Sequence, residues 1–195
     1  MDSQVRILVV SCSHDGQSKS EELAHRCLNF LNESGADATV VSLKDHSFPP
    51  FDDDHVADSI AYKNLYPLVS AADGLVLASP VYNWALCGAL KEFIEYIGST
   101  AEGSGLRGAL FDKVVTFVCA AGLPHSYMAF GPTALSLMLD FRCIVNPYQV
   151  YVHDRHWSEG NLTEEADDRL RRAMSVMLEL TTLLKPRSYQ SKWSV

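Results

Sequence analysis

The sequence has few cysteines, no surplus of positive charge and no long apolar segment, and each absence excludes a class of protein. The five cysteines of the 195 residues include no CxxC pair, which disfavours a zinc ribbon, a disulfide scaffold and a thioredoxin-type motif. Sixteen Lys and Arg against 24 Asp and Glu give a formal charge of −8. Because an acidic protein repels a phosphate polymer, we expect no nucleic-acid partner.

No apolar run approaches the roughly 20 residues that a membrane-spanning helix needs. The first ten residues, MDSQVRILVV, do not form a basic-then-apolar leader. These features predict a cytoplasmic protein with no membrane partner. The share of hydrophobic residues, 47%, is ordinary for a globular chain, and neither a repeat nor a low-complexity segment interrupts it. We expect a single domain over residues 1–195.

Short apolar runs alternate with longer stretches of helical periodicity. Five runs have the length and apolarity of strands, the first four as if buried on both faces: residues 7–10, 38–41, 75–78, 114–120 and 144–152. Pro147 cannot donate a ladder hydrogen bond, which predicts an edge position or a bulge for the fifth strand. The alternation predicts an α/β fold, with a doubly wound parallel sheet and helices on both of its faces.

Apolar residues recur every three or four positions in five segments: about residues 23–31, 60–72, 86–97, 132–141 and 170–184. Pro67 should kink or divide the second helix, because proline removes an intrahelical hydrogen bond. The fourth helix, which begins at Pro132, is apolar on more than one side, so it must be deeply buried or covered by a second subunit. We therefore predict a homodimer. Residues 98–108 are rich in Gly and Ser and predict a flexible surface excursion.

In a sheet of this kind, ligands bind at the carboxyl ends of the strands. The segment after the first strand, SCSHDGQSKS, places serines where the next helix begins. The hydroxyls of Ser11, Ser13, Ser18 and Ser20, with the unpaired N–H groups of the helix end, can hold a phosphate. Alternatively, one of these serines only caps the helix. The nucleotide loops GxGxxG and GxxxxGK[ST] do not occur.

Two further loops could meet a ligand at the same edge. After the third strand, Pro80, Tyr82, Asn83 and Trp84 form a rigid turn that can line a flat heteroaromatic ring. The alternative is a turn whose aromatic side chains only seal the end of the sheet. After the fourth strand, Gly122 permits close approach of the backbone to a ligand.

Other groups of residues favour structural interpretations. The aspartates at residues 52–54 cannot easily converge on one cation, which favours a solvated loop with a helix cap. His153, Asp154 and His156 lack further spaced ligands, so we expect no metal site. Cys12, near a helix N-terminus, could have a lowered pKa, but burial as a small apolar residue is favoured.

Three segments, taken together, resemble one family. They are SxSxxxxSKSxxLA after the first strand, LKDHSFPPFDDD after the second and ADGLVLASPVYNWALCGALKEFIEYI around the third. This combination resembles the NADPH-dependent FMN reductase family of flavodoxin-like proteins, over about residues 5–150. The resemblance implies a flavodoxin-like sheet in the order 2-1-3-4-5, with FMN as cofactor and NADPH as hydride donor. It implies a small-molecule acceptor: a quinone, an azo compound, a free flavin or a metal ion.

The resemblance also implies roles for individual residues. Contacts to the FMN phosphate fall on Ser11, Ser13, Ser18, Lys19 and Ser20, contacts to the ring on Pro80, Val81, Tyr82, Asn83 and Trp84, and a third contact on Gly122. Because the flavin carries the chemistry, no catalytic side chain is assigned. The chain departs from the family where many members have an arginine in the phosphate loop and several glycines after the fourth strand. Two alternatives stay open: a flavodoxin-like electron carrier or flavin-binding protein without NADPH turnover, and a domain that has lost its flavin.

Overall fold

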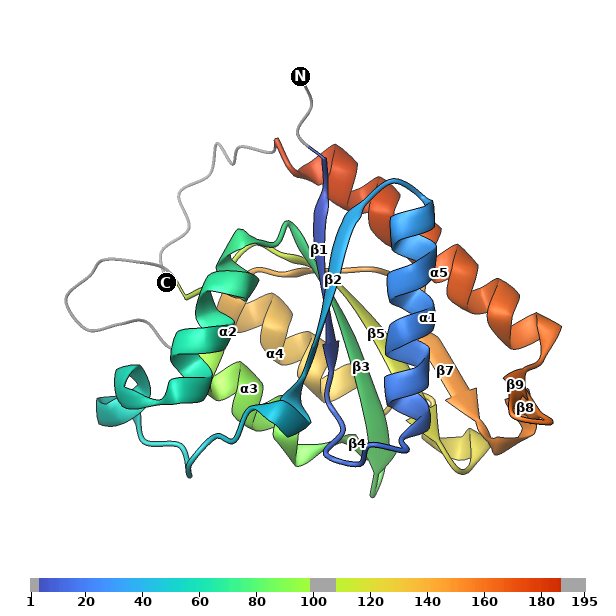
Figure 1. Cartoon of the computed structure of the whole chain (residues 1–195), viewed down its shortest axis with the longest axis horizontal. Coiled ribbons are helices and arrows are strands. Elements are labelled where there is room, and N and C mark those ends of the chain that lie inside the picture. Colours follow the sequence, from blue (N-terminus) through green and yellow to red (C-terminus); the bar gives the residue numbers. More distant parts are fainter. Residues whose placement is uncertain (1–3, 99–107, 187–195) are drawn as a thin grey trace.

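Parallel strands form the centre of the protein (Figure 1). The computed structural model describes residues 4–98 and 108–186, so the predicted excursion lies largely outside the described residues. The main strands are β1 (Arg6–Ser11), β2 (Asp37–Ser42), β3 (Gly74–Tyr82), β5 (Val114–Ala121), β6 (Ile144–Val145) and β7 (Val150–His153). A short strand, β4 (Ala85–Leu86), folds back antiparallel on β3. Two more, β8 (Trp157–Ser158) and β9 (Asn161–Leu162), form a separate hairpin.

The strand order is β2-β1-β3-β5-β6, with β7 also paired to β5. Each pairing on this path is parallel. When the short β4 is set aside, this order is the 2-1-3-4-5 arrangement of a flavodoxin-like sheet, and the prediction is confirmed. One correction concerns β2: among the described strands it pairs only with β1, and it is largely exposed or half-buried, so this edge strand is not buried on both faces.

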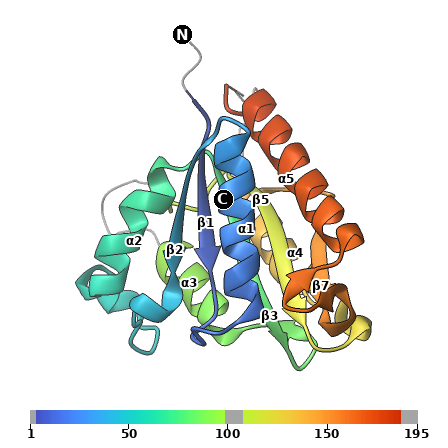
Figure 2. The same ribbon diagram turned by 45° about the vertical axis from the view of Figure 1, so that its right-hand side comes forward.

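Helices cover both faces of the sheet (Figures 1 and 2). The helices α1 (Lys19–Glu33) and α5 (Glu164–Leu184) share one core with alternate residues of β1, β3 and β5. On the opposite face lie α2 (Ile60–Ala71), α3 (Gly88–Gly98) and α4 (Gly131–Phe141), packed on the intervening residues. Because side chains alternate along a strand, each buried strand supplies both cores.

The helix α1 follows the predicted pattern closely. Its apolar stripe is buried at Leu23, Ala24, Cys27 and Leu31. Just beyond its C-terminus, Gly35 adopts a φ of +88°, which glycine reaches without the steric cost that a Cβ imposes.

The helix α2 corrects the expectation that Pro67 divides it, because the helix runs without interruption from Ile60 to Ala71. Leu65 and Val69 are buried on either side of Pro67 and hold both halves against the sheet. Pro67 itself is exposed, so the carbonyl that loses its partner is on the side that water can reach. The cost of the lost hydrogen bond is therefore reduced.

The predicted fifth strand is interrupted, as Pro147 indicates. β6 ends at Val145 and β7 begins at Val150, so four residues bulge out between two stretches that both pair with β5. Side chains replace part of the missing ladder: the Gln149 Oε1 accepts a hydrogen bond of 2.7 Å from the N–H of Phe117. The bulge at the sheet edge is therefore confirmed.

The helix α4 is not deeply buried. Only Ala134 and Leu137 are enclosed, whereas Leu135, Met138 and Leu139 are 55%, 49% and 72% exposed. Of the two explanations for its apolar sequence, deep burial is therefore wrong. Cover by a second subunit stays a prediction.

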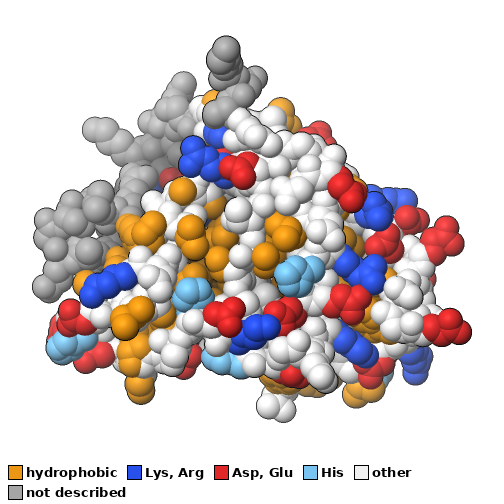
Figure 3. Space-filling model, in the orientation of Figure 1, with side chains coloured by type: hydrophobic (Ala, Val, Ile, Leu, Met, Phe, Trp, Pro, Cys, Tyr) orange, Lys and Arg blue, Asp and Glu red, His pale blue; other side chains and the backbone are white. Residues whose placement is uncertain are grey.

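The surface carries both signs of charge. On the face seen in Figure 3, acidic and basic side chains lie side by side rather than in separate patches. Within residues 4–98 and 108–186, no helix is both long enough and apolar enough to cross a membrane.

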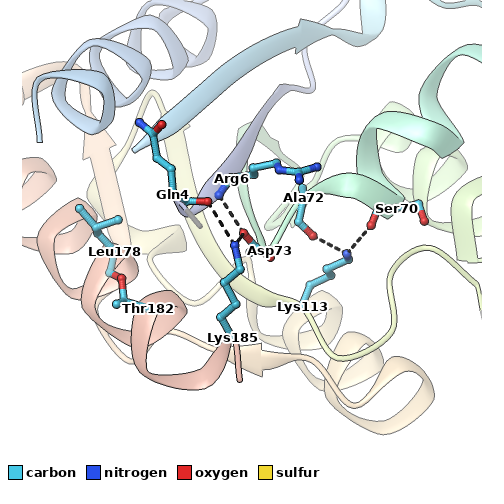
Figure 4. A network of polar contacts seen from close by, with 9 residues as sticks. All are labelled: Gln4, Arg6, Ser70, Ala72, Asp73, Lys113, Leu178, Thr182 and Lys185. Carbon is cyan, nitrogen blue, oxygen red and sulfur yellow. Dashed lines mark hydrogen bonds and ion pairs between the residues drawn. The ribbon is translucent and has the colours of Figure 1, made fainter. Parts of the chain in front are cut away.

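A polar cluster joins the amino-terminal edge of the sheet to the end of α5 (Figure 4). The Asp73 carboxylate accepts hydrogen bonds of 2.9 Å from the N–H of Arg6 and from the Lys185 Nζ. Lys185 also donates to the carbonyl of Gln4 at 3.1 Å. The carboxylate thus connects the starts of β1 and β3 to the C-terminal helix.

We expect Asp73→Ala to lower the free energy of unfolding by about 1–2 kcal/mol, because a backbone N–H and an ammonium group lose one half-buried acceptor. Urea denaturation at pH 7 measures the change. The matched control is Asp37→Ala, at the exposed start of β2, where the side chain forms no hydrogen bond or ion pair within the described residues. Equal losses in the two variants would contradict the role given to Asp73.

Candidate functional site

Three loops meet at the carboxyl edge of the sheet because β1, β3 and β5 end side by side. Ser11 is in register with Ala78, and Pro80 with Ala120. After β1 the chain turns to the face that carries α1, and after β3 to the face that carries α3. The two loops diverge at this point, which is where ligands bind in open parallel sheets.

In the first loop, the serine cluster is built around the start of α1. Ser18 caps the helix: its Oγ accepts a hydrogen bond of 3.2 Å from the N–H of Ser20. The same oxygen lies 2.8 Å from the Ser20 Oγ, and the Ser13 Oγ accepts from the N–H of Asp15 at 3.0 Å. Ser18 is therefore the N-cap of α1, and whether it also contacts a phosphate stays a prediction.

One hydroxyl of this loop has no hydrogen-bond partner among the described residues. Ser11 stands at the end of β1 and is 1% exposed, and its Oγ is buried without a hydrogen bond. An unpaired buried hydroxyl costs about 1–3 kcal/mol. A ligand oxygen placed beside the loop would remove this cost, so Ser11 stays a predicted binding position.

Both lysines near this loop are paired with acids. The Lys19 Nζ lies 2.7 Å from the Asp154 Oδ1, and the Lys44 Nζ lies 2.5 Å from the Glu21 Oε1. The hydrogen bond that Lys44 donates to the Glu21 carboxylate raises the pKa of Lys44. A Cβ built on Gly16 would lie 3.8 Å from the Lys44 Nζ, so Lys44 borders the loop. The sequence pattern does not single out Lys44, although it follows the strand that becomes the neighbour of β1.

The second loop is a tight hairpin turn in a costly backbone conformation. Tyr82 pairs with Ala85 across β3 and β4, and between them Asn83 and Trp84 have φ values of +50° and +63°. Two positive φ values in a two-residue loop are those of a type I′ turn. For a residue as large as Trp84, the left-handed region costs roughly 1–2 kcal/mol. The turn holds Tyr82 and Trp84 in water, 57% and 69% exposed.

Buried hydrogen bonds tie this turn to the first loop. The Ser79 Oγ accepts from the N–H of Cys87 at 3.3 Å and donates to the carbonyl of Pro80 at 2.9 Å. The Cys87 thiol donates to the carbonyl of Cys12 at 3.2 Å. Ser79 and Cys87 are therefore positioning residues for the turn, and their roles depend on the parallel pairing of β1 and β3, which residue spacing alone does not specify.

The cysteines of the site are structural. All five cysteines are buried, and none of them forms a disulfide in the part of the chain that the structure describes. Burial, followed by the neighbouring Cys87 and Cys119, raises the pKa of the Cys12 thiol. The interpretation of Cys12 as a small apolar residue is confirmed.

The third loop lies beside Asp154, the partner of Lys19. Gly122 is exposed after β5, and a Cβ there would be 3.7 Å from the Asp154 Oδ2, the carboxylate that holds Lys19. The hydroxyl of Tyr151 donates to the carbonyl of Leu123. Large exposed apolar side chains of the second and third loops make up what we call the apolar rim: Tyr82, Trp84, Leu123, Tyr127 and Met128. Two predicted ring contacts lie deeper, because Pro80 is buried and Val81 is half-buried.

The acidic run and the histidines have structural roles. Asp52 caps a short 3-10 helix, accepting from the N–H of Asp54 at 3.2 Å, and its other oxygen lies 2.9 Å from the His55 Nδ1. The rings of His153 and His156 are 3.9 Å apart, and burial lowers the pKa of His153. Across the part of the chain that the structure describes, no three His, Cys, Asp or Glu residues are placed to hold a metal ion.

The three loops therefore offer two different surfaces at one edge. A cradle of hydroxyls and helix N–H groups suits a phosphate whose charge is met mainly by hydrogen bonds. Beside it, the apolar rim offers aromatic surface to a flat ring. A ligand with a phosphate at one end and a heteroaromatic ring at the other matches both.

Comparison with known proteins agrees with this geometry. Residues 5–155 match the NADPH-dependent FMN reductase family. A protein of Geobacillus thermodenitrificans named NAD(P)H-dependent FAD/FMN reductase is 31% identical over 104 residues, which cover 53% of this chain and 52% of that protein. A protein of Bacillus sp. named NADPH azoreductase is 32% identical over 109 residues, 56% of this chain and 57% of that protein. The chain thus matches about half the length of these curated relatives.

Solved structures share the fold. The flavoenzyme NAD(P)H:(acceptor) oxidoreductase FerB from Paracoccus denitrificans superposes with a TM-score of 0.75 at 15% identity, covering 92% of this chain and 98% of that chain. The apo form of the NADH:FMN oxidoreductase EMOB superposes with a TM-score of 0.70 at 17% identity, covering 91% and 90%.

We expect Trp84→Gly to raise the free energy of unfolding by about 0.5 kcal/mol. Glycine adopts the left-handed conformation without strain, but it also loses more chain entropy on folding, which offsets part of the gain. The control is Tyr82→Gly, at the last residue of β3 before the turn. It should lower the free energy of unfolding by about 1 kcal/mol, because glycine weakens a strand. Chemical denaturation measures both. A destabilised Trp84→Gly variant would show that the turn stores no strain.

Proposed function

Because the chain belongs to the NADPH-dependent FMN reductase family, we propose that it is an FMN-dependent oxidoreductase that uses NADPH to reduce a small-molecule acceptor. The observation that carries the proposal is the meeting of the serine loop, with the unpaired hydroxyl of Ser11, and the exposed aromatic turn at the point where the β1 and β3 loops diverge. Quinones, azo compounds, free flavins and metal ions are the proposed acceptors.

The proposed phosphate contacts are Ser11, Ser13, Ser18, Lys19 and Ser20. The hydroxyl of Ser11 is free to donate, and the first turn of α1 adds the positive end of its helix dipole. Lys19 would exchange Asp154 for the phosphate. The cradle thus compensates for the missing arginine by hydrogen bonds, which act at short range and do not need a basic surface.

The proposed ring contacts are Pro80, Val81, Tyr82, Asn83, Trp84 and Gly122. Trp84 and Tyr82 present aromatic surface, and the Ser79 and Cys87 hydrogen bonds hold the turn at a fixed distance from the serine loop. Pro80 and Val81 support the turn from β3. Preorganisation of this kind lowers the free-energy cost of binding, because the loop is already ordered before the ligand binds.

The chemistry that bound FMN would supply is transfer of a hydride from a reduced nicotinamide to the acceptor. The chain's own part is to bind, to orient and to exclude water. The apolar rim shields one side of the site and accepts flat apolar molecules. No side chain is proposed as a general acid or base.

We also propose a homodimer in the cytoplasm. The exposed Leu135, Met138 and Leu139 of α4 form an apolar face that a second copy would cover. The five cysteines are buried and form no disulfide within the described residues, which suits a reducing compartment.

The purified protein should bind FMN, shown by quenching of flavin fluorescence, and should then oxidise NADPH when a quinone is supplied. We expect Ser18→Asp to weaken FMN binding at least about tenfold, because a carboxylate would face the phosphate. The control Ser175→Asp adds the same charge on the exposed surface of α5 and should leave the affinity unchanged. A protein that neither carries flavin nor binds added FMN would overturn the proposal.

For the dimer, Leu139→Glu should halve the mass measured by light scattering at micromolar concentration, because it places a charge in the apolar face of α4. Leu183→Glu is the matched control, since Leu183 is exposed to a similar extent, 67% against 72%, but lies on α5. If light scattering shows that the protein without substitutions is a monomer, the proposed dimer is wrong.

A further inference from the structure

A cavity of about 240 Å³ lies outside the edge strand β7, beside the first turns of α5. Its lining comes from the loop after β5, from β7 and the turn that follows it, and from α5: Tyr127, Val150, Tyr151, Val152, His156, Glu165, Ala166 and Arg169. Pockets that enclose a whole drug-sized ligand measure roughly 300–1,000 Å³. This cavity therefore suits a single ring system rather than an entire cofactor.

Polar side chains line this cavity, and those of Tyr127, Glu165 and Arg169 are exposed to water. The Tyr127 hydroxyl, the Glu165 carboxylate and the Nη groups of Arg169 form no hydrogen bond or ion pair within the described residues. The Nδ1 of His156 accepts from the N–H of His153 at 3.3 Å. The neutral ring therefore carries its proton on Nε2, which stays available as a donor.

Glu165 and Arg169 are one helical turn apart, in the spacing of a favourable ion pair, yet they do not pair. Three other acid–base pairs at this spacing do so: Glu22 with Arg26, Lys91 with Glu95, and Asp167 with Arg171. Arg169 is held aside, because its Nε donates to the carbonyl of Gln149 at 3.2 Å and its guanidinium lies 6.0 Å from the centre of the Tyr148 ring. A carboxylate acceptor and a guanidinium donor are thus kept apart on the wall of one cavity.

The chemistry of the wall limits what can fill it. An occupant that uses these groups would donate to Glu165, accept from Arg169 and His156, and contact the aromatic ring of Tyr127. A phosphate or a carboxylate would meet Glu165 with like charge. Adenine satisfies the requirements, since its exocyclic amine donates and its ring nitrogens accept.

The cavity adjoins the candidate site. Tyr127 belongs both to the cavity wall and to the apolar rim. Tyr151, also in the wall, donates its hydroxyl hydrogen to the carbonyl of Leu123, the residue after Gly122. A ligand with one ring in the cavity can therefore place a second ring at the carboxyl edge of the sheet.

We propose that this cavity binds the adenine base of NADPH while the nicotinamide lies at the apolar rim, with Glu165 and Arg169 as the residues that recognise the base. The proposal rests on the proposed function, which supplies the dinucleotide. A free adenine nucleotide offers the same base, so the experiment has to distinguish the two sources.

The probe is 5′-AMP, titrated by calorimetry into the full-length protein, with Glu165→Ala compared against Glu164→Ala. Both residues are exposed acids in the first turn of α5, but Glu164 does not line the cavity, so the loss of helix-dipole stabilisation is matched. We expect Glu165→Ala to weaken 5′-AMP binding about tenfold, the value of a hydrogen bond to a charged acceptor. The same variant should raise the KM for NADPH and leave kcat unchanged, and 5′-AMP should compete with NADPH.

Three outcomes would overturn the assignment. The first is equal 5′-AMP affinity in the two alanine variants, and the second is no binding of 5′-AMP to the unchanged protein. The third is binding that depends on Glu165 but does not compete with NADPH, which would identify a free nucleotide as the occupant. FMN binding is titrated separately: its absence would overturn the proposed function, whereas its presence with any of the three outcomes would reject the cavity alone.

Discussion

The pairing of β1 with β2 on one side and β3 on the other is the constraint on which the remaining structure depends. Because both pairings are parallel, the chain must cross over a face of the sheet between strands, and the two crossovers run on opposite faces. The loops that leave β1 and β3 therefore diverge at a single edge. The serine cradle and the aromatic turn become neighbours for this reason, although almost 70 residues separate Ser11 from Pro80.

The positions at this edge are held by few but specific contacts. Ser79, Cys87 and Cys12 form a buried chain of hydrogen bonds between the two loops. Lys19 and Asp154 connect the first loop to the end of β7, beside Gly122 of the third. The exposed ion pair contributes little to stability, but it fixes which charges face the cradle. A net charge of −8 is compatible with phosphate binding because hydroxyls and N–H groups, rather than an excess of lysine, form the cradle.

Much of the fold and part of the site were predictable from the sequence. Apolar runs and helical stripes identify the five helices, the strands β1, β2, β3 and β5, and the fifth run that forms β6 and β7, because burial on a sheet imposes a period of two or 3.6 residues. The break at Pro147 was predictable from the missing N–H. Pro67 was misjudged because its cost depends on whether the freed carbonyl reaches water, which is a tertiary property. The exposure of α4 was equally hidden, since periodicity shows that a surface is apolar but not whether this chain covers it.

The sequence by itself determined the α/β class, the position of the serine loop at a helix start and the composition of the aromatic turn, because each depends on neighbours within a few residues. Only the tertiary structure decided what lies opposite these groups. It put Lys44 beside Gly16 and Asp154 beside Lys19, and it held Trp84 at a positive φ. It also kept Arg169 apart from Glu165 at the cavity, because Arg169 contacts the carbonyl of Gln149 and the ring of Tyr148. These relations join residues that are distant in the chain. They follow from strand order and packing, about which local periodicity carries no information.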